Sequence, residues 1–171
     1  HPLRYPMMIV SSVLGGSMSS RLFQNIREQK GLAYSIFSSH HQFACDGVFE
    51  IFAGVSNENM GRLIEAIREE LEKLEKEGIT KDELEIAREQ VKSGYVFSRE
   101  NVNNRMFSNG KNLLLFGEVT PVEEIIKRLD RIKHEELESA YRLICDMSLY
   151  SSVLISGKEC DLHALMKEAK Q

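Results

Sequence analysis

The stretch LGGSMSSRLFQNIREQKGLAY, residues 14–34, constrains the fold most, because helix-ending and helix-starting residues follow each other closely within it. The glycine pair and the serine cluster at 15–20 predict the end of one helix and the start of a second, and Gly31 predicts the end of that second helix. A strand is then expected to begin near Tyr34. Arg27 falls in the last turn of the second helix, so the spacing predicts a guanidinium and a phenol at the same edge of a sheet.

The rest of the chain alternates apolar residues at helical spacing with clear start and stop signals. Thr80 and Glu83 have the spacing of a capping box, which marks the start of a helix. The stretch 48–55 alternates apolar and other residues with period two, which is typical of a half-buried strand. We expect helices over 6–16, 17–31, 56–78, 80–99, 102–117, 120–129, 137–144 and 161–170, and strands over 34–39, 48–55 and 149–155.

This order predicts an α+β fold in which an antiparallel or mixed sheet has helices packed mainly on one face. The first two strands are joined by a short connection, so they should form an antiparallel hairpin. We expect residues 1–171 to form one domain, since the length suits a single core. Three strands are few for this length, and the chain begins at His1 without an initiator methionine. We therefore expect a fragment of a longer chain, with a further strand before His1 or from another chain.

Composition excludes several classes of function. The net charge of −4 argues against nucleic-acid binding, which requires a basic surface. No apolar run reaches the roughly 18–20 residues of a membrane span, so no membrane partner is expected. The three cysteines form no CxxC pair and are odd in number, which favours a reducing compartment. A bacterial cytoplasm is expected, with the mitochondrial matrix as the alternative.

The residues alone predict no self-contained active site. The five histidines form neither HExxH nor HxxEH, so no metal site is expected within the chain. No GxSxG nucleophile motif occurs, and the glycine pair at 15–16 lacks the context of a phosphate-binding loop, so no cofactor site is expected. Arg27 and Tyr34 are the one polar pair singled out. Without further information, a surface arginine and a half-buried aromatic residue would explain them.

A resemblance changes that interpretation. The string LGGSMSSRLFQNIREQKGLAYSIFSS is similar to the C-terminal, non-zinc half-domain of the pitrilysin/insulinase family of zinc metallopeptidases, in its processing-peptidase-like bacterial branch. The similarity continues through DGVFEIFAGVSNENM and covers essentially the whole chain. It implies an α/β half-domain that faces a second, similar half around a peptide, like a clamshell. In such pairs the first half carries HxxEH and zinc, and the second half supplies an arginine and a tyrosine separated by six residues. Arg27 and Tyr34 match those two positions.

The resemblance therefore implies the substrate-binding C-terminal domain of a zinc-dependent endopeptidase. Arg27 and Tyr34 would stabilise the substrate and the transition state in trans to the zinc, which belongs to the parent enzyme or to a partner domain. The implied partners are a peptide substrate and an HxxEH-bearing N-terminal domain or subunit, with a homodimer of this domain as a further expectation. Lacking HxxEH, this chain alone should be inactive. The alternatives are a non-catalytic partner subunit and a scaffold subunit, and the presence of Arg27 and Tyr34 counts against a pure scaffold.

Overall fold

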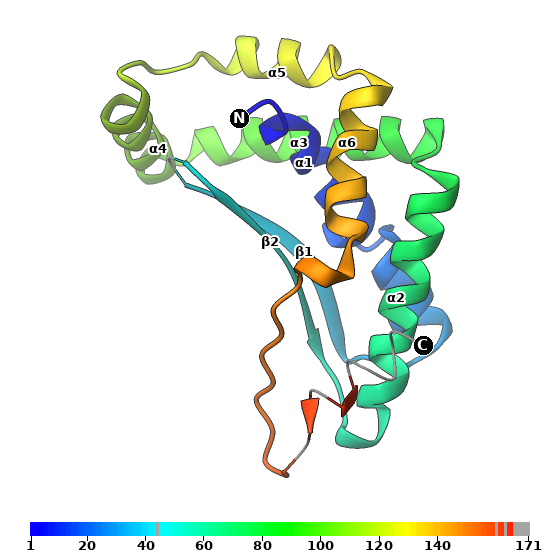
Figure 1. Ribbon diagram of the computed structural model, residues 1–171. Coiled ribbons are helices and arrows are strands. Elements are labelled where there is room, and N and C mark those ends of the chain that lie inside the picture. The colour runs from blue at the N-terminus through cyan, green and yellow to red at the C-terminus, as the bar shows by residue number, and fades with distance from the viewer. Residues whose placement is uncertain (44, 160, 163, 166–171) are drawn as a thin grey trace.

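A helix, a short helical turn and a hairpin form the first third of the molecule, and the remaining helices follow (Figure 1). The computed structural model describes residues 1–43, 45–159, 161–162 and 164–165. Its elements are α1 (Arg4–Gly15), η1 (Phe23–Gln29), β1 (Ser35–Gln42), β2 (Gly47–Gly54), η2 (Asn57–Asn59), α2 (Met60–Glu77), α3 (Lys81–Glu100), α4 (Val102–Phe116), α5 (Val122–Asp130), α6 (His134–Cys145) and η3 (Met147–Leu149).

The first helix, α1, is the centre of the core. Ile9, Val10 and Leu14 are fully buried, because their spacing places them on the faces of α1 that contact its neighbours. Strand β1 and helices α3 and α6 all pack against α1. Pro6 lies in the first turn of α1, where the missing backbone N–H costs no helical hydrogen bond. The helix therefore joins the sheet to the outer helices.

Gly15 ends α1 at the point where this helix touches the sheet. A Cβ atom on Gly15 would lie 2.3 Å from the backbone nitrogen of Ser38 in β1, so no side chain fits there. The Ser38 hydroxyl beside it donates to the carbonyl oxygen of Ser11 at 2.9 Å. Gly16 has a φ of −84°, so it does not adopt the left-handed conformation. The predicted end of the helix is confirmed, and the close approach of two backbones explains why its last residue is a glycine.

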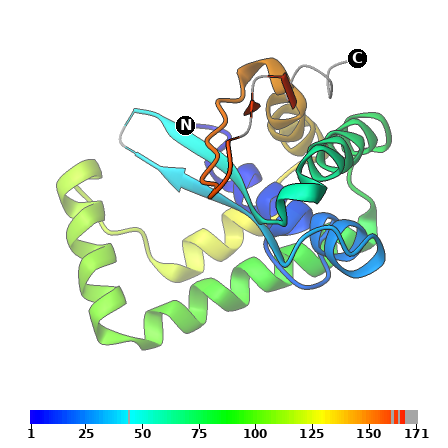
Figure 2. The same cartoon turned by 90° about the horizontal axis from the view of Figure 1, so that it is seen from below.

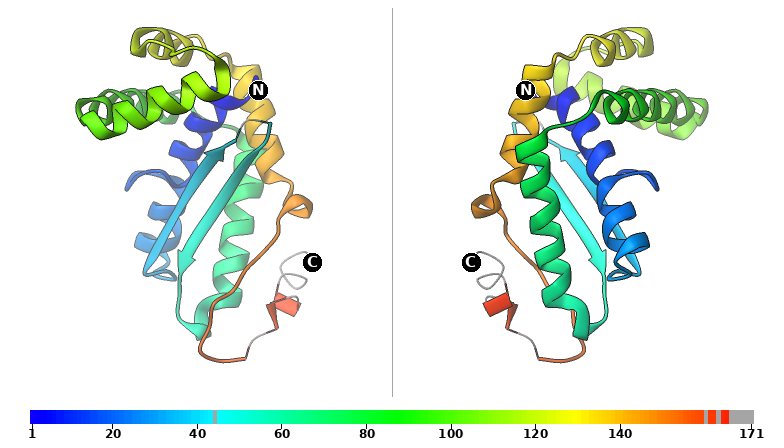
Figure 3. Two further views of the ribbon diagram at one scale, coloured as in Figure 1. Left: turned by 90° about the vertical axis from the view of Figure 1, so that its left-hand side faces the viewer. Right: turned by 90° about the vertical axis from the view of Figure 1, so that its right-hand side faces the viewer.

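The predicted hairpin is also confirmed. Strands β1 and β2 pair antiparallel, with Ser35 opposite Gly54 and Gln42 opposite Gly47. Helices cover one face of this sheet, as Figure 3 shows in two side views. On the other face Phe37 and Phe52 stack with their ring centroids 5.0 Å apart, and both side chains are exposed. The α+β class with helices on one face agrees with the prediction.

The predicted third strand is wrong. Met147–Leu149 form a 3-10 turn, and residues 151–156 have no regular secondary structure. Val153 and Ile155 are 90% and 96% exposed. Their alternating apolar pattern is that of a strand, but the described sheet contains only β1 and β2, and residues 151–156 pair with neither. Most of the terminal helix expected at 161–170 lies outside the described residues. Within this range, the described residues 162, 164 and 165 are helical.

The helices after the hairpin follow their sequence signals. Thr80 and Glu83 form the predicted capping box, in which the Glu83 amide donates to the Thr80 hydroxyl oxygen and the Thr80 amide donates to the Glu83 carboxylate. Gly78, with a φ of 72°, ends α2. Helix α4 differs from the others, because it contains no buried residue, and Figure 2 shows it at the margin of the molecule. Its apolar side chains are therefore left without cover in the described part of the chain.

Candidate functional site

Arg27 lies in η1, whose geometry is unusual. The sequence predicts an ordinary helix here, whereas Phe23–Gln29 form a π-helix. The Lys30 amide, for example, donates to the carbonyl oxygen of Asn25, five residues earlier, at 3.1 Å. The guanidinium of Arg27 lies over the ring of Phe23, with Cζ 4.7 Å from its centroid. π-Helical turns are rare and are found frequently at functional sites.

The chain between Arg27 and Tyr34 is fixed by one glycine and two buried residues. Gly31 has a φ of +61°, a conformation that other residues adopt only with strain. The Leu32 amide then donates to the carbonyl oxygen of Ile26 at 3.0 Å, and the side chains of Leu32 and Ala33 are buried. The turn therefore anchors the connection to the core on both sides of the glycine.

Tyr34 stands at the beginning of the sheet with its side chain in solvent. Its amide donates to the carbonyl oxygen of Gly54 at 2.8 Å, which fixes its backbone to the end of β2. Its side chain is 87% exposed, the opposite of the half-buried aromatic that composition alone would suggest. Arg27 is also exposed, and its one ion pair among the described residues is a 3.6 Å contact with the neighbouring Glu28. Both side chains therefore come from one short connection and are free to donate hydrogen bonds to a ligand.

A partly buried ion pair holds the beginning of this segment in place. The Nε and Nη2 atoms of Arg21 donate to the two carboxylate oxygens of Glu83 at 2.6 and 2.8 Å, and Nη2 also donates to the Gly78 carbonyl oxygen at 2.7 Å. Burial opposes ionisation of Glu83, but the hydrogen bonds from Arg21 and Thr80 outweigh it and lower the pKa of Glu83 to about 2. This contact joins the start of η1 to the start of α3. The sequence revealed the cap at Glu83 but held no signal for its partner Arg21.

The described residues include no group of three or more histidine, cysteine, aspartate or glutamate side chains that could hold a metal ion. His40 and His41 point to opposite faces of β1, as expected for neighbours in a strand. The Nε2 atom of His41 lies 3.0 Å from a Glu50 carboxylate oxygen on the open face of the sheet. His40 is half-buried, and burial followed by the charge of His41 lowers its pKa.

Two cysteines fall within the described residues, and both are free. Cys45 is exposed in the hairpin loop. Cys145 donates from Sγ to the Leu71 carbonyl oxygen at 3.2 Å, and burial, with a smaller effect of Glu75, raises its pKa to about 12. A thiol with so high a pKa is a poor nucleophile. Cys160 lies outside the described residues.

None of the helices in the described ranges is long and apolar enough to cross a lipid bilayer.

The candidate site is the surface formed by η1, Gly31 and Tyr34, the residue that precedes β1. It offers a cation and a neutral hydrogen-bond donor, and the described residues provide no metal or nucleophile beside them.

Known proteins with similar sequences are longer than this chain. The chain is 40% identical over 156 residues to YmxG of Bacillus subtilis, which is named as an uncharacterized zinc protease. It is 30% identical over 151 residues to an uncharacterized zinc protease of Mycobacterium tuberculosis. These alignments cover 91% and 88% of the chain but only 38% and 34% of the relatives. The chain thus spans little more than a third of the relatives that it matches.

Solved structures share the fold at low sequence identity. The inactive peptidase domain of a protein from Bordetella parapertussis superposes with a TM-score of 0.73 at 15% identity, covering 86% of this chain and 80% of that one. A conserved protein from Enterococcus faecalis gives a TM-score of 0.71 at 23% identity, covering 82% of this chain and 32% of that one.

A family model decides the classification. The model described as the peptidase M16 inactive domain matches residues 1–91, which include α1, η1, the hairpin, α2 and the first half of α3. That range contains both Arg27 and Tyr34 and more than half of the chain. The zinc-protease names of its relatives and the fold of its structural neighbours agree with this match. The chain belongs to the family of peptidase M16 inactive domains.

Proposed function

We propose that this domain is the substrate-binding, non-metal half of a zinc endopeptidase, and that it binds a peptide between itself and an HxxEH-bearing half. The observation that carries the proposal is the connection from η1 to β1. It exposes Arg27 and Tyr34 while the two residues before Tyr34, Leu32 and Ala33, are buried. A tyrosine that is 87% exposed contributes little to the core, so its position favours a role in binding.

The chemistry of the two side chains suits peptide hydrolysis. The carbonyl oxygen of a peptide becomes negatively charged in the tetrahedral intermediate, and fixed donors near that oxygen lower the barrier. The Tyr34 hydroxyl is a neutral donor, and the Arg27 guanidinium is a planar cationic donor. Stacking on Phe23 limits the movement of Arg27, which reduces the entropy lost when it binds a substrate. Zinc held by the other half would supply an activated water molecule and polarise the carbonyl group.

The relatives favour a cis arrangement, in which the metal-bearing half belongs to the same polypeptide. Their names describe zinc proteases, and this domain matches only 38% of the length of YmxG. A partner subunit in trans and a scaffold subunit are the alternatives. The cytoplasmic location expected from the cysteines stays a prediction, and one structural neighbour, PqqL of Escherichia coli, is described as periplasmic.

Substitutions in the assembled enzyme test the proposal. Tyr34→Phe and Arg27→Ala should each lower kcat/KM for peptide cleavage by roughly 100-fold or more, the effect of losing a strong oxyanion donor. Both side chains are exposed, so the thermal unfolding temperature should hardly change. Arg62→Ala, at an exposed arginine of α2, is the matched control and should cleave like the wild type. Wild-type cleavage by both Tyr34→Phe and Arg27→Ala would overturn the proposal and favour the scaffold alternative.

A further inference from the structure

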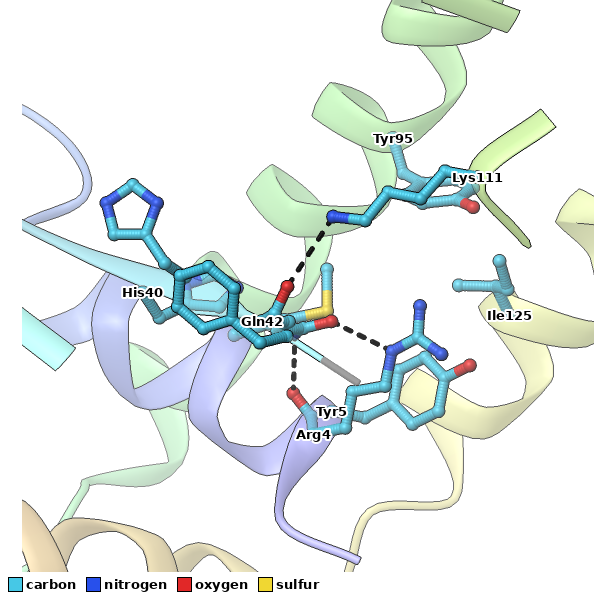
Figure 4. A pocket seen from close by; sticks show the side chains of 10 residues that line it. Arg4, Tyr5, His40, Gln42, Tyr95, Lys111 and Ile125 are labelled. Carbon is cyan, nitrogen blue, oxygen red and sulfur yellow. Dashed lines mark hydrogen bonds between the residues drawn. The ribbon is translucent and has the colours of Figure 1, made fainter. Parts of the chain in front are cut away.

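A cavity of about 390 Å³ lies at the far end of the hairpin from Tyr34. Figure 4 shows the residues that line it. Tyr34 precedes the first residue of β1, whereas the cavity is lined by residues at the end of that strand. Its other walls come from the first two turns of α1 and from α3, α4 and α5. Nothing in the proposed role of Arg27 and Tyr34 uses this cavity.

Arg4 presents a fixed guanidinium to the cavity. Its Nε atom donates to the Gln42 side-chain oxygen at 2.9 Å, and the Gln42 side-chain nitrogen Nε2 donates back to the Arg4 carbonyl oxygen at 3.5 Å. The guanidinium also lies over the rings of Tyr5 and Phe116, 5.3 and 5.5 Å from their centroids. Within the described part of the chain, no acceptor bonds to its two terminal nitrogens. A held arginine with both terminal nitrogens available matches the two oxygens of a carboxylate.

A second cation, Lys111, lines the same cavity. Lys111 reaches from α4 and donates to the Gln42 carbonyl oxygen at 3.5 Å, a long bond (Figure 4). Two positive side chains thus contact the same residue, in a chain with a net charge of −4. The described residues that line the cavity include no aspartate or glutamate. The nearby Arg128, which lies over the Tyr5 ring, is already paired with Glu124 at 3.0 Å. The charges of Arg4 and Lys111 are therefore left without a carboxylate partner in the described part of the chain.

The remaining walls suit an organic group. Tyr5 and Tyr95 line the cavity with aromatic rings, and Met8 and Ile125 add apolar surface. The Tyr5 hydroxyl is buried and forms no hydrogen bond of good geometry among the described residues, although Arg128 lies near enough to interact with it. Ligand sites typically combine such apolar walls with a few polar groups that fix the orientation of the ligand.

We propose that this cavity binds a carboxylate group carried by a peptide, with Arg4 and Lys111 as its cationic partners. The carboxylate is either an acidic side chain or the C-terminal carboxylate of the peptide. Binding of the carboxylate is independent of Arg27 and Tyr34. The idea that a substrate uses this cavity as a second contact rests on the proposed peptidase function.

Three short probes separate the two sources of the carboxylate. Acetyl-Ala-Glu-amide carries a side-chain carboxylate, acetyl-Ala-Gln a terminal carboxylate, and acetyl-Ala-Gln-amide none. Calorimetric titration of the full-length protein at low salt should show that at least one carboxylate probe binds 10-fold or more tightly than the neutral probe, and the tighter of the two identifies the source. Equal binding of all three probes would overturn the proposal.

Variants then assign the binding to the cavity. Arg4→Gln with Lys111→Gln should weaken binding of the carboxylate probe 10-fold or more. Lys111→Gln alone, at an exposed position of α4, should weaken it without affecting folding, so the test holds even if loss of Arg4 destabilises the domain. Arg62→Gln with Lys81→Gln removes the same charge from exposed positions elsewhere and should leave binding unchanged. Equal binding by wild type and Lys111→Gln, or equal weakening by the control pair, would contradict the assignment.

The same probes distinguish this proposal from the function of the other site. Tyr34→Phe should bind the carboxylate probe like the wild type even where it no longer cleaves peptides. If Tyr34→Phe and Arg27→Ala both cleave normally but Lys111→Gln loses probe binding, the proposed function fails and the carboxylate site stands.

Discussion

Helices α1 and α4 are both rich in apolar residues, yet they have opposite environments. Seven of the twelve residues in α1 are buried, including Ile9, Val10 and Leu14, whereas none of the fifteen residues in α4 is buried. Leu14 is fully buried and Leu114 is 87% exposed. The difference lies in the neighbours, since α1 is enclosed by β1, α3 and α6, while α4 lies at the margin (Figure 2). Apolar content alone thus does not define a core.

The comparison also separates two tasks within the domain. The region around α1 supports the connection that presents Arg27 and Tyr34, and it lies within the range matched by the family model. Helix α4 lies beyond that range and contributes Lys111 to the cavity at the hairpin tip. Substitutions of the buried residues in α1 should therefore affect stability, and substitution of Lys111 in α4 should affect binding at the cavity.

Truncating one leucine in each helix should give the largest difference in stability between two variants. Leu14→Ala should lower the free energy of unfolding by about 2–5 kcal/mol, because it leaves a cavity in a fully buried position. Leu114→Ala should change it by less than about 0.5 kcal/mol. Urea unfolding curves of the two variants measure both values. Equal losses would mean that Leu114 is covered in solution, and the contrast between the helices would then fail.

A glycine in each helix gives the next largest effect. Gly15→Ala should destabilise the domain by about 1–3 kcal/mol, because the new methyl group would collide with the backbone of β1. A methyl group on Gly110 in α4 would meet no described atom within 4 Å outside its own helix backbone. Gly110→Ala should therefore stabilise the domain by about 0.5–1 kcal/mol through helix propensity. Thermal unfolding of both variants tests whether Gly15→Ala lowers the stability of the domain and Gly110→Ala raises it. A tolerated Gly15→Ala would contradict the close approach of α1 and β1.

The ion pair between Arg21 and Glu83 predicts a smaller, pH-dependent effect. The pKa of Glu83 is about 2 in the folded domain, below its usual value of 4.5, so its contribution is fully present above about pH 4.5 and is lost as the pH falls toward 2. Glu83→Gln should therefore lower the free energy of unfolding by about 1–2 kcal/mol at pH 7. The gap to the wild type should close between pH 4.5 and 2.

A surface pair provides the control for this prediction. Glu72 pairs with Arg68 on α2, and its side chain is 61% exposed. Glu72→Gln should cost less than about 0.5 kcal/mol at every pH, because exposed ion pairs contribute little. Urea unfolding across the pH range compares the two variants. A Glu83→Gln deficit that persists unchanged at pH 2 would show that the carboxylate charge is not its cause.

Local signals in the sequence predicted most of the helices and the hairpin. The capping box at Thr80 and Glu83 involves residues three apart, and the hairpin connection is short, so both can be inferred without knowing the rest of the fold. The strand predicted over 149–155 failed because a strand needs a neighbour to bond with, and its apolar pattern does not reveal whether one is present.

The candidate site could be predicted only in part. The family resemblance identified Arg27 and Tyr34, but the π-helix under Arg27 has no sequence signal that we recognise. The pairing of Arg21 with Glu83 and the approach of Gly15 to Ser38 depend on how distant segments pack. The cavity at the hairpin tip combines residues from five elements and the hairpin loop, which a local pattern cannot anticipate.

The most direct test of the central claim is kcat/KM for peptide cleavage by the assembled enzyme carrying both Arg27→Ala and Tyr34→Phe, compared with the two single variants. If both side chains act on the same substrate, the double variant should lose roughly 100-fold or more, and the two losses should not simply multiply. The zinc content should equal that of the wild type, since neither residue is proposed to hold the metal. Wild-type kcat/KM in the double variant would contradict the claim that this domain takes part in cleavage through Arg27 and Tyr34.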